Sequence, residues 1–201
     1  ITNTNRQIHT TRHTIGQSKS RAMAQRLQSI NPEIRIAIQE AFYAEATREA
    51  LFSQPFDLLV DAIDSVRHKA HLLDAARRRD RPVITVGGAG GRIDPSRIRF
   101  GDLSRTSGDR LLMLVRKKLR GQYGFPRANL GSFRIPAVYS DEPPRFPWAD
   151  GTICFEREPA SPGGLDCASG LGSVTHLTAT MGLHAAAAVL RQIAAAPEPL
   201  H

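Results

Sequence analysis

Two carboxylates that follow a short apolar run are the residues of this chain best suited by type and spacing to chemistry. Asp61 and Asp64 come directly after residues 58–60, which are Leu, Leu and Val. Such a run is typical of a parallel strand covered on both faces, and ligands of open α/β sheets bind at the carboxyl ends of these strands. Carboxylate oxygens are preferred ligands of Mg²⁺. We therefore predict that Asp64 holds a metal ion on a nucleotide, while Asp61 equally suits a structural role in capping the next turn.

The glycine-rich segment 87–91 is a weaker candidate for phosphate binding. A dinucleotide-binding loop opens a helix, whereas here residues 92–95 lead into the strand-like residues 97–103. The segment instead suits a backbone turn where bulkier residues would clash with a ligand or a neighbouring strand. Cys154 and Cys167 are too few for a disulfide framework or a four-cysteine zinc site, and Cys167 is not predicted to be catalytic.

Alternating helices and strands must position these residues. Apolar spacing predicts helices over 16–30, 46–52, 66–79, 109–120 and 171–195, and strands over 34–38, 58–63, 82–86, 97–103, 133–139 and 151–155. Ser65 is the expected N-cap of the third helix, and Pro32 ends the first. Strand, helix and strand over 58–86 form a βαβ crossover. The predicted fold is therefore α/β, with a Rossmann-like, mostly parallel sheet and flanking helices.

The length of 201 residues predicts one domain, residues 1–201. Within it, residues 121–151 are rich in Pro, Gly and Arg and are too long for an ordinary connector, which predicts a functional loop or lid. The apolar C-terminal helix is interrupted by polar and charged residues, so it is not predicted to span a membrane, although weak membrane association stays open. The start carries no apolar signal-peptide core, and few cysteines suit a cytoplasmic protein.

The net charge of +8, with a pI near 10.3, favours a polyanionic partner, and nucleic acid is the leading candidate. A protein that is merely basic fits the charge equally well. The polar face of the helix over 109–120 carries four cations, Arg116, Lys117, Lys118 and Arg120. That face suits a nucleic-acid patch or a solvated surface, and the sequence slightly favours the second.

Several motifs together resemble a known superfamily. Asn3-Thr4-Asn5-Arg6-Gln7, Gly16 with Lys19, Ile30-Asn31-Pro32 and Asp61-Ala62-Ile63-Asp64 resemble the adenylate-forming superfamily of ubiquitin-activating enzymes and their bacterial relatives ThiF and MoeB. Three further segments are similar to the tRNA threonylcarbamoyladenosine dehydratases, and the resemblance covers essentially the whole chain. They are residues 61–67, residues 85–91 with Asp94-Pro95, and Asp166-Cys167-Ala168-Ser169-Gly170.

This resemblance implies an adenylation fold that binds ATP with magnesium. In the dehydratase branch, the threonyl carboxylate of threonylcarbamoyladenosine beside the tRNA anticodon attacks the α-phosphate and expels pyrophosphate. The modification's own atoms then close a ring and release AMP, with net loss of water. The resemblance also implies a homodimer and a cysteine desulfurase or sulfur-acceptor partner, and it is compatible with a monovalent cation.

Matching the family motif residue by residue implies the site. Arg6 would contact the terminal phosphates, Lys19 the triphosphate, and Asp64 would hold magnesium directly or through water. These three are the expected catalytic residues. The expected nucleotide-binding set adds the polar residues of the same N-terminal motif, Asn3, Asn5 and Gln7.

The chain also departs from the family pattern. The family's glycine-rich nucleotide loop and ribose-binding acidic residue lie upstream of the Asn-x-Asn-Arg-Gln motif and are absent here, and the first residue is Ile1. We therefore expect an N-terminally truncated chain that lacks the first βαβ unit, holds half an ATP site and binds ATP poorly by itself. Two alternatives remain: a ThiF- or MoeB-like activator of a ubiquitin-like protein's C-terminus, which the missing Cys-x-x-Cys pairs disfavour, and a non-catalytic truncated module that binds RNA or a partner protein.

Overall fold

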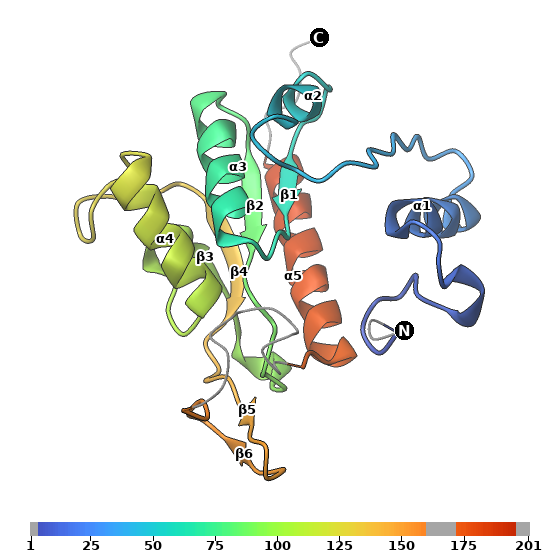
Figure 1. Ribbon diagram of the computed structural model, residues 1–201. Helices are drawn as coiled ribbons and strands as arrows, with labels where there is room; N and C mark the ends of the chain where they lie inside the picture. The colour runs from blue at the N-terminus through green and yellow to red at the C-terminus, as the bar shows by residue number, and fades with distance from the viewer. Residues whose placement is uncertain (1–3, 160–171, 196–201) are drawn as a thin grey trace.

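The core of the protein is a four-stranded, mostly parallel sheet with helices on both faces. The computed structural model describes residues 4–159 and 172–195. Strands run in the order β1, β2, β4, β3; the first three are parallel and β3 is antiparallel to β4. Figure 1 shows α3 and α4 on one face of this sheet and α5 on the other. The predicted α/β fold is confirmed. The strand bounds are β1 Leu59–Asp61, β2 Val83–Val86, β3 Ile98–Asp102 and β4 Pro136–Ser140.

The helices form where the apolar spacing predicts them. Their bounds are α1 Lys19–Ile30, α2 Arg48–Phe52, α3 Val66–Arg78, α4 Arg110–Gln122 and α5 Thr175–Ala194, with short 3₁₀ turns η1 Arg12–Thr14, η2 Pro95–Arg97 and η3 Leu103–Arg105. Ser65 caps α3 as expected, because its side chain accepts from the His68 amide. Asp109 caps α4 in the same way, at 2.9 Å from the Leu112 amide. These caps fix where both helices start beside the sheet edge.

One apolar core lies between the sheet and the pair α3 and α4. It contains the predicted inward residues Leu72 and Leu73 of α3 and Leu112, Val115 and Leu119 of α4, all of them buried. A smaller cluster on the other face joins α5 to β3 and β4 through Leu177 and Met181. Burial of this apolar surface is the main term that stabilises the fold.

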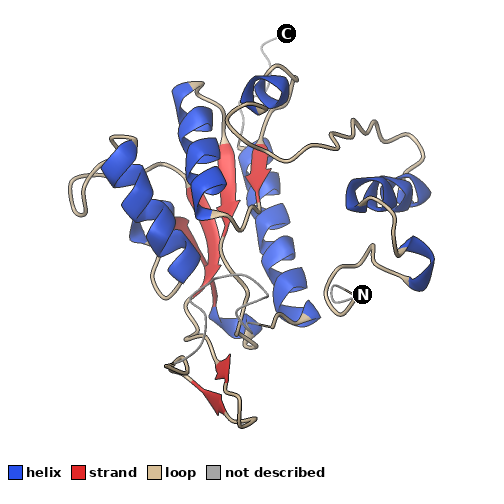
Figure 2. Ribbon diagram, viewed as in Figure 1, coloured by secondary structure: helices blue, strands red, loops and turns tan. Residues whose placement is uncertain are grey.

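The strand predicted over residues 34–38 is wrong. Figure 2 shows loop between α1 and α2, and no strand is assigned there. The alternation of apolar residues has the right period, but a strand needs a neighbour to complete its backbone hydrogen bonds, and none lies beside it among the described residues. Ile38 is accordingly exposed, and α1 stands apart from the layered core in Figure 1.

The structure differs from two further expectations, one about β1 and one about the segment 121–151. β1 lies at the edge of the described sheet, and Val60 is 45% exposed, so the expectation that both faces are covered is wrong. The segment 121–151 contains β4, an inner strand of the sheet, and β5 Phe146–Pro147. β5 pairs antiparallel with β6 Ile153–Cys154 to form a small hairpin. A functional role of 121–151 stays a prediction.

No helix among the described residues is long and apolar enough to cross a membrane.

Candidate active site

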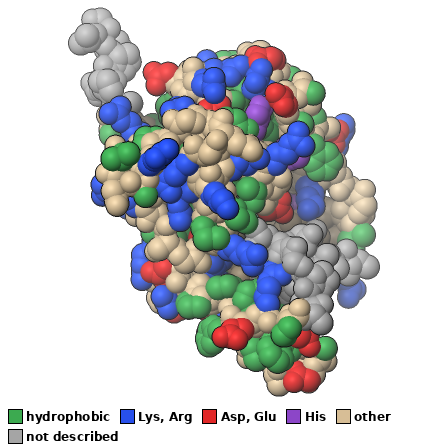
Figure 3. Space-filling model, turned by 60° about the vertical axis from the view of Figure 1, so that its left-hand side comes forward, with side chains coloured by type: hydrophobic (Ala, Val, Ile, Leu, Met, Phe, Trp, Pro, Cys, Tyr) green, Lys and Arg blue, Asp and Glu red, His purple; other side chains and the backbone are tan. Residues whose placement is uncertain are grey.

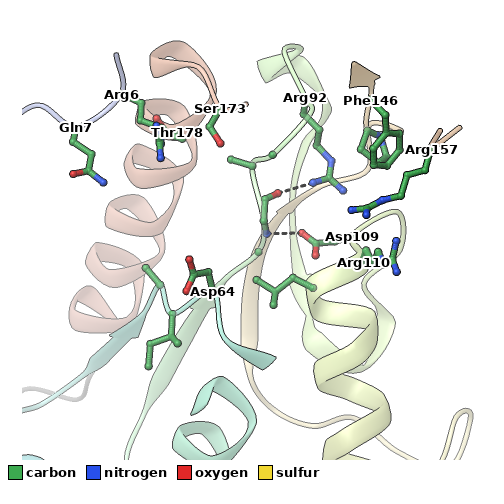
Figure 4. A pocket seen from close by; sticks show the side chains of 18 residues that line it. Arg6, Gln7, Asp64, Arg92, Asp109, Arg110, Phe146, Arg157, Ser173 and Thr178 are labelled. Atoms are coloured by element: carbon green, nitrogen blue, oxygen red, sulfur yellow. Dashed lines mark hydrogen bonds between the residues drawn. The ribbon is translucent and has the colours of Figure 1, made fainter. Parts of the chain in front are cut away.

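A cavity of about 310 Å³ opens at the carboxyl edge of the sheet, where β1 and β2 end. Asp64 reaches it from the turn after β1, and the glycine segment reaches it from the turn after β2 (Figure 4). The start of α4, the start of α5 and the β5–β6 hairpin provide the other walls. The cavity is lined by Arg6, Gln7, Ala62, Ile63, Asp64, Gly87, Gly88, Ala89, Gly90, Arg92, Asp109, Arg110, Leu111, Pro144, Phe146, Arg157, Ser173 and Thr178.

A buried ion pair fixes the turn that carries Asp64. Lys69 Nζ of α3 lies 2.8 Å from Asp61 Oδ2, and neither side chain has exposed surface. Asp61 Oδ2 also accepts from the Thr85 hydroxyl at 2.7 Å, and Asp61 Oδ1 accepts from the Ile63 amide at 3.0 Å. Lys69 Nζ donates to the Ile63 carbonyl at 2.9 Å. Asp61 therefore has the structural role, capping the next turn, that the sequence left open.

Asp109 and Arg92 hold the glycine segment in place. Asp109 Oδ2 accepts from the Gly88 amide at 2.9 Å, while its other oxygen caps α4. Arg92, which is buried, donates to the carbonyls of Gly88 at 2.7 Å, Gly108 at 2.8 Å and Glu142 at 2.8 Å. The two contacts to Gly88 are the dashed lines in Figure 4. The segment is thus a turn clamped from both sides, as its sequence context predicts.

Gly87 has no room for a side chain. A Cβ atom at this position would lie 2.2 Å from Asp109 Oδ2 and 3.2 Å from Tyr139 Cβ. The absence of a side chain lets the backbone approach the carboxylate closely enough for the next amide to donate to it. A bulkier residue at Gly87 would clash, but mainly with the Asp109 side chain at the start of α4, whereas the prediction named a ligand or a neighbouring strand.

The cavity combines an exposed carboxylate with several guanidinium groups. Asp64 is exposed and makes no hydrogen bond or ion pair within 4–159 and 172–195. Arg6, Arg110 and Arg157 line the same space from the N-terminal segment, α4 and the chain after β6 (Figure 4). Guanidinium groups bind phosphate or carboxylate oxygens through paired N–H donors. The lining therefore suits a polyanionic ligand.

The same donors limit the metal that could bind. In the part of the chain that the structure describes, no group of three or more His, Cys, Asp or Glu side chains could hold a metal ion. A single carboxylate still fits Mg²⁺, which is commonly bound by one or two carboxylates together with substrate phosphates and water.

The structure brings only some of the predicted site residues together. Arg6 and Gln7 line the cavity with Asp64. Asn5 does not line it; its side chain donates to the Ser173 carbonyl at 2.9 Å and accepts from Arg6 at 3.1 Å, which ties the N-terminal segment to the start of α5. Lys19 is exposed at the start of α1, outside the cavity lining. Asn3 and the motif segment 166–170 lie outside the described residues.

Sequence reasoning missed several residues of this site. The cavity is also lined by Arg92, Asp109, Arg110 and Arg157. Lys69 does not line it, but forms the buried ion pair with Asp61 next to the turn that carries Asp64. One signal was available: β1 and β2 are parallel neighbours, so the glycine segment that follows β2 must reach the same edge as Asp64. The capping position of Asp109 could also be predicted from the sequence, but its contact with Gly88, 21 residues away, could not be predicted.

The chain as a whole is similar to known proteins of one family. The ThiF family model matches residues 1–199. The tRNA threonylcarbamoyladenosine dehydratase of Escherichia coli (strain K12) is 39% identical over 196 residues, which is 97% of this chain and 73% of that protein. The solved structure of TcdA (CsdL) superposes with a TM-score of 0.86 at 37% identity, covering 96% of this chain and 72% of that one. The E. coli enzyme in complex with ATP gives a TM-score of 0.82 at 34% identity, covering 96% and 71%.

Proposed function

This chain belongs to the ThiF family, and from that premise we propose that it is an ATP-dependent tRNA threonylcarbamoyladenosine dehydratase. The observation that carries the proposal is the cavity in which Asp64, without a partner among the described residues, faces Arg6, Arg110 and Arg157 beside a clamped glycine turn. Two relatives that carry this enzyme name match 97% and 96% of the chain, and one of these enzymes was solved with ATP bound.

The reaction needs positioning and charge stabilisation more than it needs a protein nucleophile. The threonyl carboxylate of the modified adenosine attacks the α-phosphate, an oxygen–phosphorus bond forms, and pyrophosphate leaves with its electron pair. An atom of the same modification then attacks the activated carbonyl, and AMP leaves. One ATP is thus converted to AMP and pyrophosphate for each water removed from the modification.

The arginines of the cavity have distinct tasks in this proposal. Arg6, tied to α5 through Asn5, would contact the terminal phosphates and offset the charge that develops on pyrophosphate. Arg110 and Arg157 reach the same space from the opposite wall (Figure 4) and would neutralise the remaining phosphate oxygens or the substrate carboxylate. Gln7 adds amide donors on the side of Arg6.

Asp64 is the proposed magnesium residue. It would hold the ion directly or through water together with nucleotide phosphates, and the ion when bound would neutralise phosphate charge during displacement. Lys19 and Asn3 remain part of the proposed nucleotide set through the family motif alone.

Other properties come from the family resemblance and are proposed on that basis. They are a homodimer, a cytoplasmic location, a monovalent cation and a cysteine desulfurase or sulfur-acceptor partner. The tRNA substrate is implied by the name of the related enzymes.

A nucleotide-release assay tests the proposed function. The full-length protein is incubated with Mg-ATP and either tRNA carrying threonylcarbamoyladenosine or the same tRNA without the modification. Release of AMP and pyrophosphate only with the modified tRNA is the expected result. Release driven instead by a ubiquitin-like protein would support the activator alternative, and no release under any condition would support a non-catalytic module.

A further inference from the structure

Two groups of cations lie close together in the fold, one at the end of α3 and one along α4 and just after it, and they differ in their ion pairs. The arginines at the end of α3 pair with carboxylates of the protein. Arg78 Nε lies 2.6 Å from Asp74 Oδ2, and Arg77 Nη2 lies 3.6 Å from Asp74 Oδ1. Arg79 Nη2 lies 2.6 Å from Glu49 Oε1 of α2. Two carboxylates thus offset part of the charge of these three arginines and tie the end of α3 to α2.

The second group has four cations: Arg116, Lys117 and Arg120 on α4, and Arg127 after its end. Arg116 donates to the Thr106 hydroxyl, and Arg120 donates to the carbonyls of Pro126 at 3.1 Å and Ser104 at 3.4 Å. Lys117 and Arg127 make no side-chain hydrogen bond within 4–159 and 172–195. Across those described ranges, none of the four forms an ion pair with a carboxylate. Their bonds to neutral acceptors orient the guanidinium groups and leave the positive charge uncompensated.

These four cations share one shallow groove. It has a volume of about 490 Å³ and is lined by Met113, Arg116, Lys117, Arg120, Gly121 and Arg127, with no acidic residue among them. The face that carries α4 comes forward in Figure 3, where Lys and Arg side chains are spread over the middle and Asp and Glu side chains lie mainly toward the top and bottom. A groove of this charge fits a chain of phosphates.

The groove and the active-site cavity are built on the same helix. Arg110, the first residue of α4, lines the cavity, and Met113 lines the groove three residues later. The 13 residues of α4 span about 20 Å. A nucleic acid whose modified base enters the cavity would therefore bring its neighbouring backbone to the groove.

We propose that this α4 groove binds backbone phosphates of the tRNA substrate next to the modified adenosine. The inference rests on the proposed function and adds the surface through which the substrate is held. Arg116 and Arg120 are the oriented contacts, because hydrogen bonds hold their guanidinium groups, and Lys117 and Arg127 are the exposed outer ones. Three of the four cations on the face that the sequence slightly favoured as a solvated surface belong to this proposed groove: Arg116, Lys117 and Arg120.

The double variant Lys117→Gln/Arg127→Gln tests the groove, because both side chains are exposed and contribute no hydrogen bond to the described fold. The dissociation constant of tRNA is measured by fluorescence anisotropy at several salt concentrations. We expect a loss of affinity of roughly 10- to 30-fold at about 0.1 M salt, and a salt slope smaller by about two. The dissociation constant of ATP should be unchanged. The control is Arg78→Gln, an exposed arginine outside the groove that forms an ion pair with Asp74, and it should bind tRNA like the wild type.

Each outcome decides the inference. Wild-type affinity and salt slope in the double variant, or an equal loss in Arg78→Gln, would overturn it, as would a wild-type protein that binds no tRNA. Binding is measured without turnover, so the proposed function is judged separately. A wild-type protein that binds tRNA through the groove without dehydrating it would reject the dehydratase activity and leave the groove standing. If the protein dehydrates the tRNA but the double variant binds tRNA with wild-type affinity, the dehydratase activity is supported and the groove is rejected.

Discussion

Lys69 Nζ and Asp61 Oδ2 form a fully buried ion pair of 2.8 Å directly beneath the turn that carries Asp64. The pair joins α3 to the end of β1, and the Thr85 hydroxyl joins β2 to the same carboxylate. An arrangement of this kind holds a loop residue at a fixed place, because each buried polar group is bonded to another. The reach of Asp64 into the cavity is therefore set by groups that never touch a ligand.

Removing one partner of this pair should destabilise the protein strongly. Lys69→Met leaves the Asp61 carboxylate buried without its cation, so the free energy of unfolding should fall by about 3–5 kcal/mol. Urea unfolding followed by circular dichroism measures it. The double variant Lys69→Met/Asp61→Asn should recover part of the loss, because no unpaired charge remains. Equal stability of Lys69→Met and the wild type would show that the pair contributes nothing.

Gly87→Ala should damage the nucleotide site. The added Cβ would lie 2.2 Å from Asp109 Oδ2, so the carboxylate must move and release the Gly88 amide. We expect weaker ATP binding by calorimetry and a loss of roughly 1–3 kcal/mol in stability from overpacking. Gly182→Ala on α5 is the control, since nothing lies within 4 Å of its Cβ position. Normal ATP affinity in Gly87→Ala would mean that the clamp on the glycine turn has no part in binding.

Asp64→Ala should remove turnover without unfolding the protein. The side chain is exposed and bonds to no described residue, so the thermal midpoint should stay near that of the wild type. Loss of the magnesium residue should lower the rate by about 100-fold or more. Asp57→Ala, an exposed carboxylate just before β1, controls for loss of charge. Turnover at the wild-type rate in Asp64→Ala would remove this residue from the metal role.

The architecture and the location of the candidate active site could be predicted from the sequence because they depend on local patterns. Apolar runs of the right length gave the βαβ crossover, and Asp64 at a strand end indicated the ligand edge. Residues 34–38 show the limit of this reasoning. Their alternation has the strand period, but strand formation depends on a partner strand elsewhere in the chain, and the pattern contains no information about one.

The clamp around the glycine turn could not be predicted for a related reason. Arg92 bonds to the carbonyl of Glu142, 50 residues away, and Asp109 bonds to the Gly88 amide 21 residues away. Nothing in the local sequence distinguishes these residues from an ordinary surface arginine and an ordinary helix cap. These contacts form only in the folded chain, where β4 lies beside β2 and the start of α4 lies beside the glycine segment that follows β2.

His71 should make stability depend on pH. Its Nδ1 atom lies 2.9 Å from the Tyr43 hydroxyl, and burial of the ring lowers the pKa of His71 below its ordinary value of 6.5. Between the pKa of His71 in the folded state and its ordinary value of about 6.5, the unfolded chain binds a proton that the folded protein does not bind. Stability should therefore fall as the pH decreases through this range. Urea midpoints between about pH 7.5 and 5.5 should fall less steeply in His71→Gln. A wild-type slope in His71→Gln would contradict the assignment.

The most direct test follows the modified nucleoside itself. The full-length protein is incubated with Mg-ATP and tRNA carrying threonylcarbamoyladenosine. The tRNA is then digested, and the masses of the nucleosides are measured by mass spectrometry. The dehydratase assignment predicts loss of one water from the modified nucleoside, with one AMP formed for each nucleoside converted. A modified nucleoside that keeps its full mass after prolonged incubation with active, ATP-binding protein would contradict it.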